Sequence, residues 1–168
     1  MPVSPLIRPA TPADIPAILA LMQGLAEYEK LTHLFAATEA NLHTSLFGEQ
    51  PAAQCLVAEN ETGTGLVAYA LWFQNYSTFL AKPGLYLEDL YVHPEQRGRG
   101  IGKALLLRLA AIALERGYGR FEWTVLDWNQ PAIDFYEGMG AQILPEWRIV
   151  RVTGDALVNM GKKGANHG

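Results

Sequence analysis

Hydrophobic residues recur along the chain with two periods, and the two periods predict where strands and helices lie. Runs of aliphatic and aromatic residues bounded by turn residues predict strands over 5–8, 54–59, 66–76, 85–92, 121–126 and 142–152. Apolar residues spaced three or four apart predict helices over 12–29, 39–47, 100–116 and 130–139. The three middle strands have short links, so we expect them to be antiparallel neighbours. The strand–helix–strand order that follows predicts that 85–92 and 121–126 run parallel.

The segment 85–109 combines a buried strand, a glycine-rich turn and an amphipathic helix. Pro94 ends the strand, because proline cannot donate a hydrogen bond to a ladder. Gly98, Gly100 and Gly102 then let the backbone turn tightly and approach a ligand closely. The first N–H groups of the helix lack internal partners and lie at the positive end of the helix dipole, which makes an anion site. Positive charge is added by Arg97, Arg99 and Lys103.

Two common phosphate motifs do not fit this turn. A P-loop needs a hydroxyl where Ala104 stands and a glycine where Arg97 stands. A dinucleotide fingerprint needs a third glycine where Lys103 stands. The pattern Arg97-x-x-Gly100-x-Gly102, between a strand and a helix, does fit this turn and is a candidate phosphate site. The alternative is that the glycines only form the entry to a helix and bind no ligand.

Composition limits the class of protein. A chain of 168 residues, 49% hydrophobic and 18% charged, is typical of one globular domain, which we expect over residues 1–160 with a flexible tail over 161–168. The net charge of -4 argues against nucleic acid as a partner, since nucleic-acid binding needs a basic face.

The cellular setting is suggested by what the sequence lacks. Cys55 is the only cysteine, which excludes an internal disulfide and fits a reducing cytoplasm. No apolar run approaches the roughly 20 residues of a membrane span, and the first residues do not resemble a signal peptide. We therefore expect a cytoplasmic protein without a membrane partner.

The turn at Arg97, Gly100 and Gly102 resembles the acetyl-coenzyme A loop of the GNAT N-acetyltransferase superfamily. A second segment, 128–141, is similar to the superfamily's N-x-x-A/S-x-x-x-Y…G-F/A segment. Together with 87–92, 146–148 and the acidic tyrosine cluster at 27–29, it looks most like the diamine (spermidine/spermine) acetyltransferase branch. The resemblance covers nearly the whole chain, but the link between 141 and 146 is shorter than in the animal enzymes of that branch.

The resemblance implies a fold and a reaction. The fold would be α/β (α+β), with a mixed, mostly antiparallel central sheet of about six or seven strands flanked by about four helices. The reaction would be direct acetyl transfer, in a ternary complex, from acetyl-CoA to a primary amine of a small cationic acceptor. A diamine, a polyamine or a lysine-like amino acid would fit. A homodimer is expected by analogy.

The resemblance also implies a set of site residues. Coenzyme contacts would come from Leu90, Tyr91, Val92, Arg97, Gly98, Arg99, Gly100, Ile101, Gly102, Lys103, Asn129, Ala132 and Tyr136. The acceptor would contact Glu27, Tyr28, Glu88, Asp89, Trp123, Glu146 and Trp147.

Acetyl transfer needs a base, an oxyanion donor and an acid. A primary amine has a pKa of about 10.4 and must lose a proton before it attacks. Strand alternation puts Glu88 on one face with Leu90 and Val92, among apolar neighbours. Burial there would raise the pKa of Glu88 and make it a better base, acting directly or through a water. Asp89 would face the other way. A backbone N–H near residues 90–92 would bind the oxyanion, and Tyr136 is implied as the general acid that protonates the leaving thiolate.

Simpler structural roles compete with these assignments. Glu88 could face solvent, Tyr136 could pack beside Phe135, and Asn129 could cap a helix. Cys55 has no adjacent base and fits a core position better than a nucleophile. The four histidines lack metal-ligand spacing, so we expect no metal. A protein N-terminus or lysine as acceptor, and a non-catalytic acyl-CoA-binding module, remain the alternative functions.

Overall fold

The computed structural model describes residues 5–166. These residues form two compact units, the first ending at Thr124 and the second beginning at Val125, and each unit is described by itself. Whether residues 1–160 act as one domain stays a prediction.

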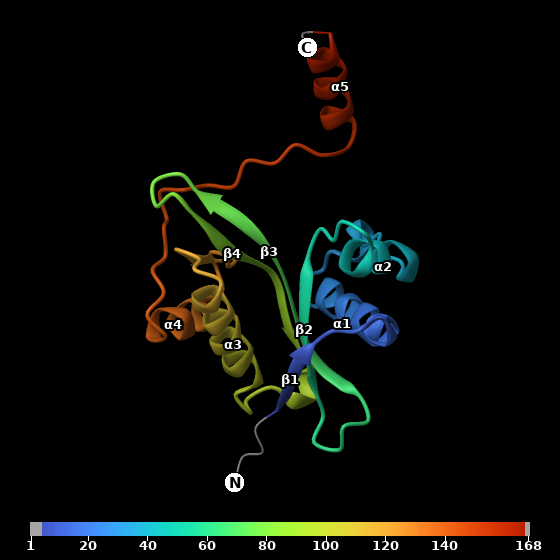
Figure 1. Cartoon of the computed structure of the whole chain (residues 1–168), viewed down its shortest axis with the longest axis vertical. Coiled ribbons are helices and arrows are strands. Elements are labelled where there is room, and N and C mark those ends of the chain that lie inside the picture. The colour runs from blue at the N-terminus through green and yellow to red at the C-terminus, as the bar shows by residue number, and fades with distance from the viewer. Residues whose placement is uncertain (1–4, 167–168) are drawn as a thin grey trace. The chain divides into compact units, whose positions relative to one another are not determined.

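The first unit is built around a sheet of five strands in the order β1-β2-β3-β4-β5 (Figure 1). The strands are β1 (Leu6–Pro9), β2 (Gln54–Glu59), β3 (Leu66–Ser77), β4 (Lys82–Val92) and β5 (Phe121–Glu122). The pairs β1–β2, β2–β3 and β3–β4 are antiparallel, and the pair β4–β5 is parallel. The predicted directions of the strands are therefore confirmed, while the sheet has fewer strands than the six or seven expected.

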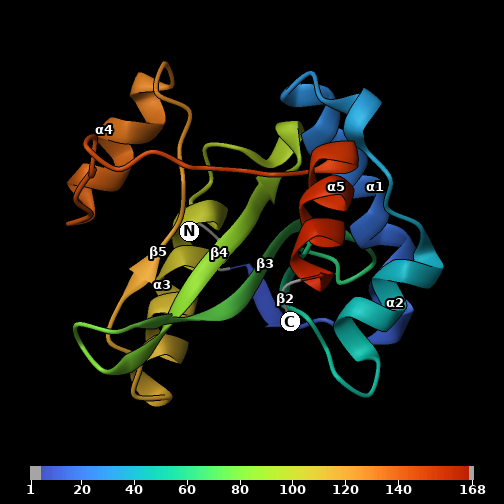
Figure 2. The ribbon, with the colours of Figure 1, turned by 90° about the horizontal axis from the view of Figure 1, so that it is seen from above.

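Three α-helices cover the two faces of this sheet. Helices α1 (Ile15–Tyr28) and α2 (Glu39–Phe47) lie on one face and α3 (Ile101–Glu115) on the other (Figures 1 and 2). The core on the α1 side joins apolar residues of both helices to side chains of β2, β3 and β4. The apolar positions that the sequence predicts for α3 are all buried: Ile101, Leu105, Leu109 and Ile112.

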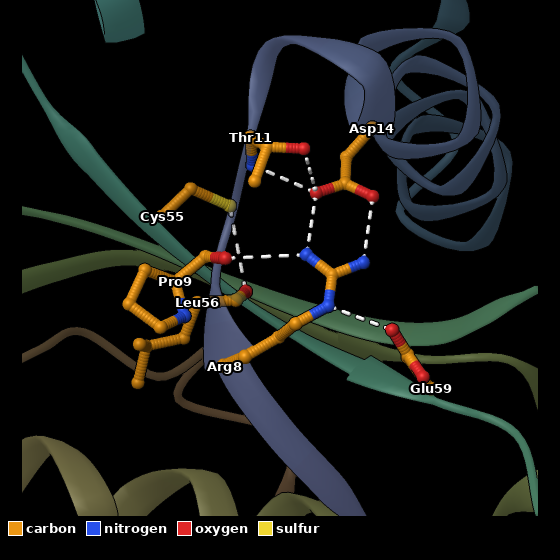
Figure 3. Close-up of polar contacts among 7 residues, drawn as sticks. All are labelled: Arg8, Pro9, Thr11, Asp14, Cys55, Leu56 and Glu59. Carbon is orange, nitrogen blue, oxygen red and sulfur yellow. Dashed lines mark hydrogen bonds and ion pairs between the residues drawn. The ribbon is translucent and has the colours of Figure 1, made fainter. Parts of the chain in front are cut away.

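A polar network fixes the start of α1 to the sheet (Figure 3). Arg8 on β1 forms two hydrogen bonds to the Asp14 carboxylate, of 2.7 and 2.9 Å, and its Nε lies 2.7 Å from Glu59 Oε1 on β2. The backbone N–H of Thr11 donates to the same Asp14 carboxylate. These donors lower the pKa of Asp14 to about 2, mainly through the Arg8 hydrogen bond, and the two carboxylates raise the pKa of Arg8.

A bulge interrupts β4 at Glu88, one of the predicted site residues. Leu71 of β3 pairs with Asp89 and Trp72 pairs with Leu87, so Glu88 is an extra residue on β4. Paired residues face the same side, and Leu71 packs against the core that contains α1. Asp89 therefore faces the α1 side of the sheet.

The second unit contains two helices, α4 (Gln130–Gly138) and α5 (Gly154–Ala165). The predicted strand over 142–152 is wrong, because within the described part of the second unit these residues have no strand partner. The predicted strand over 121–126 shortens to the two residues of β5. A strand needs a neighbour for its backbone hydrogen bonds, and residue pattern alone cannot supply one.

Helix α5 was not predicted, although its ends carry helix signals. Asp155 lies in the first turn, and Lys162 and Lys163 lie in the last turn, so both charges complement the helix dipole. The helix includes residues 161–165 of the predicted tail, and residues 167–168 lie outside the described residues. No helix within residues 5–166 is long and apolar enough to cross a membrane.

Candidate active site

The glycine-rich loop between β4 and α3 has a left-handed backbone at two of its glycines. Gly98 and Gly100 have φ angles of 78° and 81°, in the left-handed region that favours glycine. A Cβ atom built on either residue would meet nothing within 4 Å, so both face open space from which a ligand can approach. Gly100 is the N-cap of α3, so the first N–H groups of this helix, which lack partners within the helix, directly follow the loop.

The two arginines of the loop point in different directions. Arg99 Nη1 lies 3.4 Å from Glu61 Oε1, in the turn between β2 and β3. Arg97 Nε donates to the backbone oxygen of Val92 at 3.0 Å, and its guanidinium carbon lies 5.0 Å from the centroid of the Tyr28 ring. Coenzyme contacts from the loop stay a prediction, and the contact between Arg97 and Tyr28 was not predicted.

Beyond the bulge, β4 has a free edge beside the loop. Its pairing with β5 is limited to Leu85 and Tyr86, and the described part of the first unit has no other strand there. The N–H of His93 donates to Val67 on β3 at 2.8 Å. Because N–H groups alternate in direction along a strand, those of Leu90 and Val92 point to the free edge. A contact between these N–H groups and an oxyanion stays a prediction.

A cavity of about 320 Å³ opens on the α1 side of the sheet. Its walls come from α1, from the 3-10 helix Thr32–Leu34 and the residues beside it, and from β3 and β4. Most of the lining is apolar, and its polar side chains are Glu29, Tyr69 and Asp89. This lining suits a small molecule with an aliphatic chain and a positive charge.

Asp89 is the more buried of the two carboxylates in the cavity wall, since it is half-buried whereas Glu29 is exposed. The hydroxyl of Tyr69 donates to Asp89 Oδ2 at 3.2 Å. Burial raises the pKa of Asp89 to about 6, with smaller contributions from the negative charges of Glu88 and Glu29, while the Tyr69 hydrogen bond opposes the rise. Burial also raises the pKa of Tyr69 itself, so Tyr69 stays a hydrogen-bond donor.

Glu88 does not lie among apolar neighbours, so that part of the prediction is wrong. It is exposed at the bulge, and Asp89 is the carboxylate of the pair that lies in the cavity wall. Alternation itself holds beyond the bulge, because Leu90 and Val92 lie near Gly102 of α3 while Asp89 faces the α1 side. Glu88 is the extra residue at the bulge, and its side chain is exposed there. A role for Glu88 as base stays a prediction.

The other predicted acceptor residues are dispersed. Glu27 and Tyr28 are exposed at the end of α1, and Trp123 is half-buried with its ring 4.7 Å from that of Phe121. Glu146 and Trp147 are exposed in the second unit. Of the predicted set, Asp89 lies in the wall of the cavity.

Sequence reasoning missed Tyr69 and the segment that follows α1. Residues 31–37 were not predicted to contribute to a site, yet Leu31, Leu34 and Phe35 line the cavity. One signal for Tyr69 was available, because a tyrosine in a buried strand usually needs a partner for its hydroxyl. Its partner depends on the pairing between β3 and β4, which the sequence does not reveal.

The predicted residues of the second unit have local roles there. The Asn129 side chain accepts a hydrogen bond of 3.4 Å from the Ala132 N–H and caps α4. Tyr136 lies on α4 with its ring centroid 5.7 Å from that of Phe135, and burial raises its pKa.

Cys55 and the metal-ligating residue types were also predicted to have no chemical role. Burial raises the pKa of Cys55 to about 12, which keeps its thiol protonated. The described residues contain no group of three or more His, Cys, Asp or Glu side chains that could hold a metal ion.

Comparison with known proteins identifies the family. Residues 18–141 match the acetyltransferase (GNAT) family. The chain is 40% identical to thialysine N-epsilon-acetyltransferase of Sus scrofa, over 95% of this chain and 99% of that protein. It is 36% identical to L-ornithine N5-acetyltransferase NATA1 of Arabidopsis thaliana, over 93% of this chain and 87% of that protein. An integron cassette protein from the mobile metagenome of V. cholerae has the same fold, with a TM-score of 0.78, 25% identity and coverage of 95% and 99% of the two chains. The chain therefore belongs to the GNAT family of acetyltransferases.

Proposed function

We propose that this acetyltransferase moves the acetyl group of acetyl-CoA to a primary amine of a small cationic acceptor. The observation that carries the proposal is the cavity, whose apolar wall holds the carboxylates of Glu29 and Asp89. An aliphatic chain fits the apolar lining, and a second ammonium group fits the acids. The named activities of similar proteins, on thialysine and ornithine, support a diamine, a polyamine or a lysine-like amino acid.

The glycine loop and the free edge of β4 would bind the coenzyme. The N–H groups at the start of α3 suit its pyrophosphate, and Lys103 is exposed in the first turn of that helix. The outward N–H groups of Leu90 and Val92 suit the pantetheine arm and the oxyanion that forms at the thioester carbon. Transfer would be direct, within a ternary complex of enzyme, acetyl-CoA and amine.

Two carboxylates are candidates for the base that takes the proton of the ammonium group. Glu88 is exposed and accessible to a bridging water, whereas Asp89 lies in the cavity wall with a pKa raised to about 6. A raised pKa makes a carboxylate a stronger base. Tyr136 would return a proton to the thiolate of the leaving coenzyme.

The test is release of free thiol from acetyl-CoA with putrescine, spermidine, lysine, thialysine, ornithine, glycine and a peptide as acceptors. We expect turnover on one class of cationic amine, and a loss of at least about tenfold in kcat for Tyr136→Phe, equal to about 1.4 kcal/mol of barrier. Turnover on the peptide alone would instead favour a protein acceptor. Coenzyme binding without turnover on any acceptor would favour a non-catalytic module.

We further propose that the enzyme is a cytoplasmic homodimer. Residues 142–152 include the exposed apolar side chains of Trp147, Ile149 and Val150. A second copy of the chain would cover them. The single buried cysteine fits a reducing compartment. Sedimentation of native protein and of Val150→Lys tests the dimer, and a monomeric native protein would contradict it.

A further inference from the structure

The side chain of Arg97 joins the glycine loop to two aromatic rings outside the loop. Its guanidinium carbon lies 5.0 Å from the ring centroid of Tyr28 and 5.4 Å from that of Tyr91. Both distances are within the range of cation–π attraction. With the hydrogen bond from Nε to Val92, these contacts tie the loop to the end of α1 and to the end of β4.

Both rings belong to the segments that carry the carboxylates of the cavity. Tyr28 is the last residue of α1 and directly precedes Glu29, which lines the cavity. Tyr91 follows Asp89 by two residues, so both face the α1 side of β4. A side chain that restrains these two rings therefore also restrains the backbone that positions Glu29 and Asp89.

The Tyr91 ring is firmly held, whereas the Tyr28 ring is not. Tyr91 is 7% exposed and packs against Gly24 of α1. Tyr28 is 55% exposed at the end of that helix, and the next residues lead into the 3-10 segment that forms one wall of the cavity. Arg97 thus connects a fixed point on β4 to the more exposed end of α1.

We infer that Arg97 is a positioning residue that couples coenzyme binding at the glycine loop to amine binding in the cavity. The inference rests on the proposed function. A coenzyme that orders the loop backbone also orders Arg97, which then holds Tyr28, and with it Glu29, in place for the amine. Such coupling is reciprocal, so the amine tightens coenzyme binding by the same factor.

The coupling is measured by calorimetric titration of thialysine into the protein alone and into protein saturated with desulfo-coenzyme A. This analogue lacks the sulfur and cannot carry an acetyl group. For the native protein we expect thialysine to bind about tenfold more tightly when the analogue is present, within the usual range of coupling. For Arg97→Met, which keeps an unbranched apolar chain but neither the charge nor the N–H donors, the factor should fall below about threefold.

Substitutions of Tyr28 separate this role from simple phosphate binding. Tyr28→Leu should lower the coupling factor as Arg97→Met does, and the double variant should lose no more than either single variant, because both remove one contact. Tyr28→Phe keeps the ring face and should keep the factor. Arg99→Met is the matched control, since Arg99 is on the same loop but pairs with Glu61; it should weaken binding of the analogue and leave the coupling unchanged.

The outcomes distinguish this inference from the proposed function. Equal coupling factors for native protein and Arg97→Met would overturn the inference, as would an equal loss for Arg99→Met. The inference would also be overturned if the native protein bound thialysine equally well with and without the analogue, or did not bind it in either case. Failure of the native enzyme to acetylate any amine would contradict the proposed function, whereas efficient acetylation without coupling would contradict this inference alone. Arg97 and Tyr28 are both exposed, so the variants should keep the native melting temperature.

Discussion

The hydroxyl of Tyr69 on β3 donates a hydrogen bond of 3.2 Å to the carboxylate of Asp89 on β4, in the wall of the cavity on the α1 side of the sheet. Burial and the hydrogen bond act in opposite directions on Asp89. Burial favours the neutral carboxyl group, while the Tyr69 donor favours the carboxylate. The resulting pKa of about 6 makes the charge of the cavity sensitive to pH in the range where the enzyme can be assayed.

The first prediction concerns the charge of Asp89. Asp89→Asn should raise KM for a cationic amine at pH 8 by about tenfold or more, because a hydrogen bond to a charged group is worth about 1.5–3 kcal/mol. In the native enzyme kcat/KM should fall as pH drops through about 6, where Asp89 gains a proton and no longer attracts the amine. Steady-state kinetics between pH 5 and pH 9 measure both effects.

Glu88→Gln is the matched comparison for this prediction. If Glu88 is the base, Glu88→Gln should lower kcat and leave KM for the amine nearly unchanged. If Asp89 is the base, Asp89→Asn should lower kcat as well as raise KM. A native KM and an unchanged acid limb in Asp89→Asn would contradict the assignment of Asp89 to the acceptor site.

The second prediction concerns Tyr69. Tyr69→Phe removes the donor that lowers the pKa of Asp89, so that pKa should rise above about 6 and the acid limb of kcat/KM should move to higher pH. Tyr118→Phe is the control, because its hydroxyl bonds to Gln74 at the surface, and its profile should match the native one. A limb in Tyr69→Phe that stays in place or moves to lower pH would show that this hydrogen bond does not set the ionisation of Asp89.

Local sequence signals predicted much of this fold. The strand 54–59 and the helix 39–47 match β2 and α2 residue for residue. In both cases turn or capping residues bound the periodic run, and the Thr38 side chain indeed accepts a hydrogen bond from the Asn41 N–H at the start of α2. The strand 142–152 failed because a strand also needs a neighbour, which local pattern does not guarantee.

The candidate site also has parts that the sequence predicts and parts that it does not. The glycine loop was predictable, since its glycines and the helix start are adjacent in the sequence. The assignment of Glu88 and Asp89 to their surroundings was not, because it depends on a bulge that only the pairing between β3 and β4 defines. Tyr69 and the segment 31–37 reach the cavity through tertiary packing, for which the sequence has no local signal.

The third prediction concerns stability at low pH. The pKa of Asp14 is lowered from 3.8 to about 2 in the folded protein, so its stabilising effect is full above about pH 4 and is lost as pH falls through about 2. A shift of this size corresponds to about 2 kcal/mol at neutral pH. Asp14→Asn should therefore lower the free energy of unfolding by about 2 kcal/mol at pH 7, with a smaller difference from native at pH 2.5. Urea unfolding at the two pH values measures this difference.

The control for Asp14 is an ion pair at the surface. Glu115→Gln breaks the exposed contact with Arg108, of 3.1 Å, and should change the free energy of unfolding by less than about 1 kcal/mol at pH 7. An equal loss for Asp14→Asn at both pH values would mean that packing, and not the charge of the carboxylate, accounts for its effect.

The last prediction concerns Gly24, where α1 crosses β4. A Cβ atom at Gly24 would lie 2.6 Å from the hydroxyl oxygen of Tyr91 and 3.0 Å from the ring carbon that bears it. Alanine should gain about 1 kcal/mol in helix propensity, but overpacking typically costs about 1–3 kcal/mol. The Tyr91 ring is buried and cannot turn into solvent, so we expect Gly24→Ala to lower the melting temperature.

Two further variants test this explanation. Gly24→Ala combined with Tyr91→Phe removes the oxygen that the new methyl group meets, and should recover part of the lost stability. Gly161→Ala in α5 adds the same methyl group where nothing lies within 4 Å, so only the propensity gain should remain, and circular dichroism melts should show no loss. If Gly24→Ala proves as stable as the native protein, α1 must be able to move away from β4. The packing of α1 on β4 would then not hold Tyr28 and Tyr91 in fixed positions beside Arg97, and the coupling between the two binding sites would not be expected.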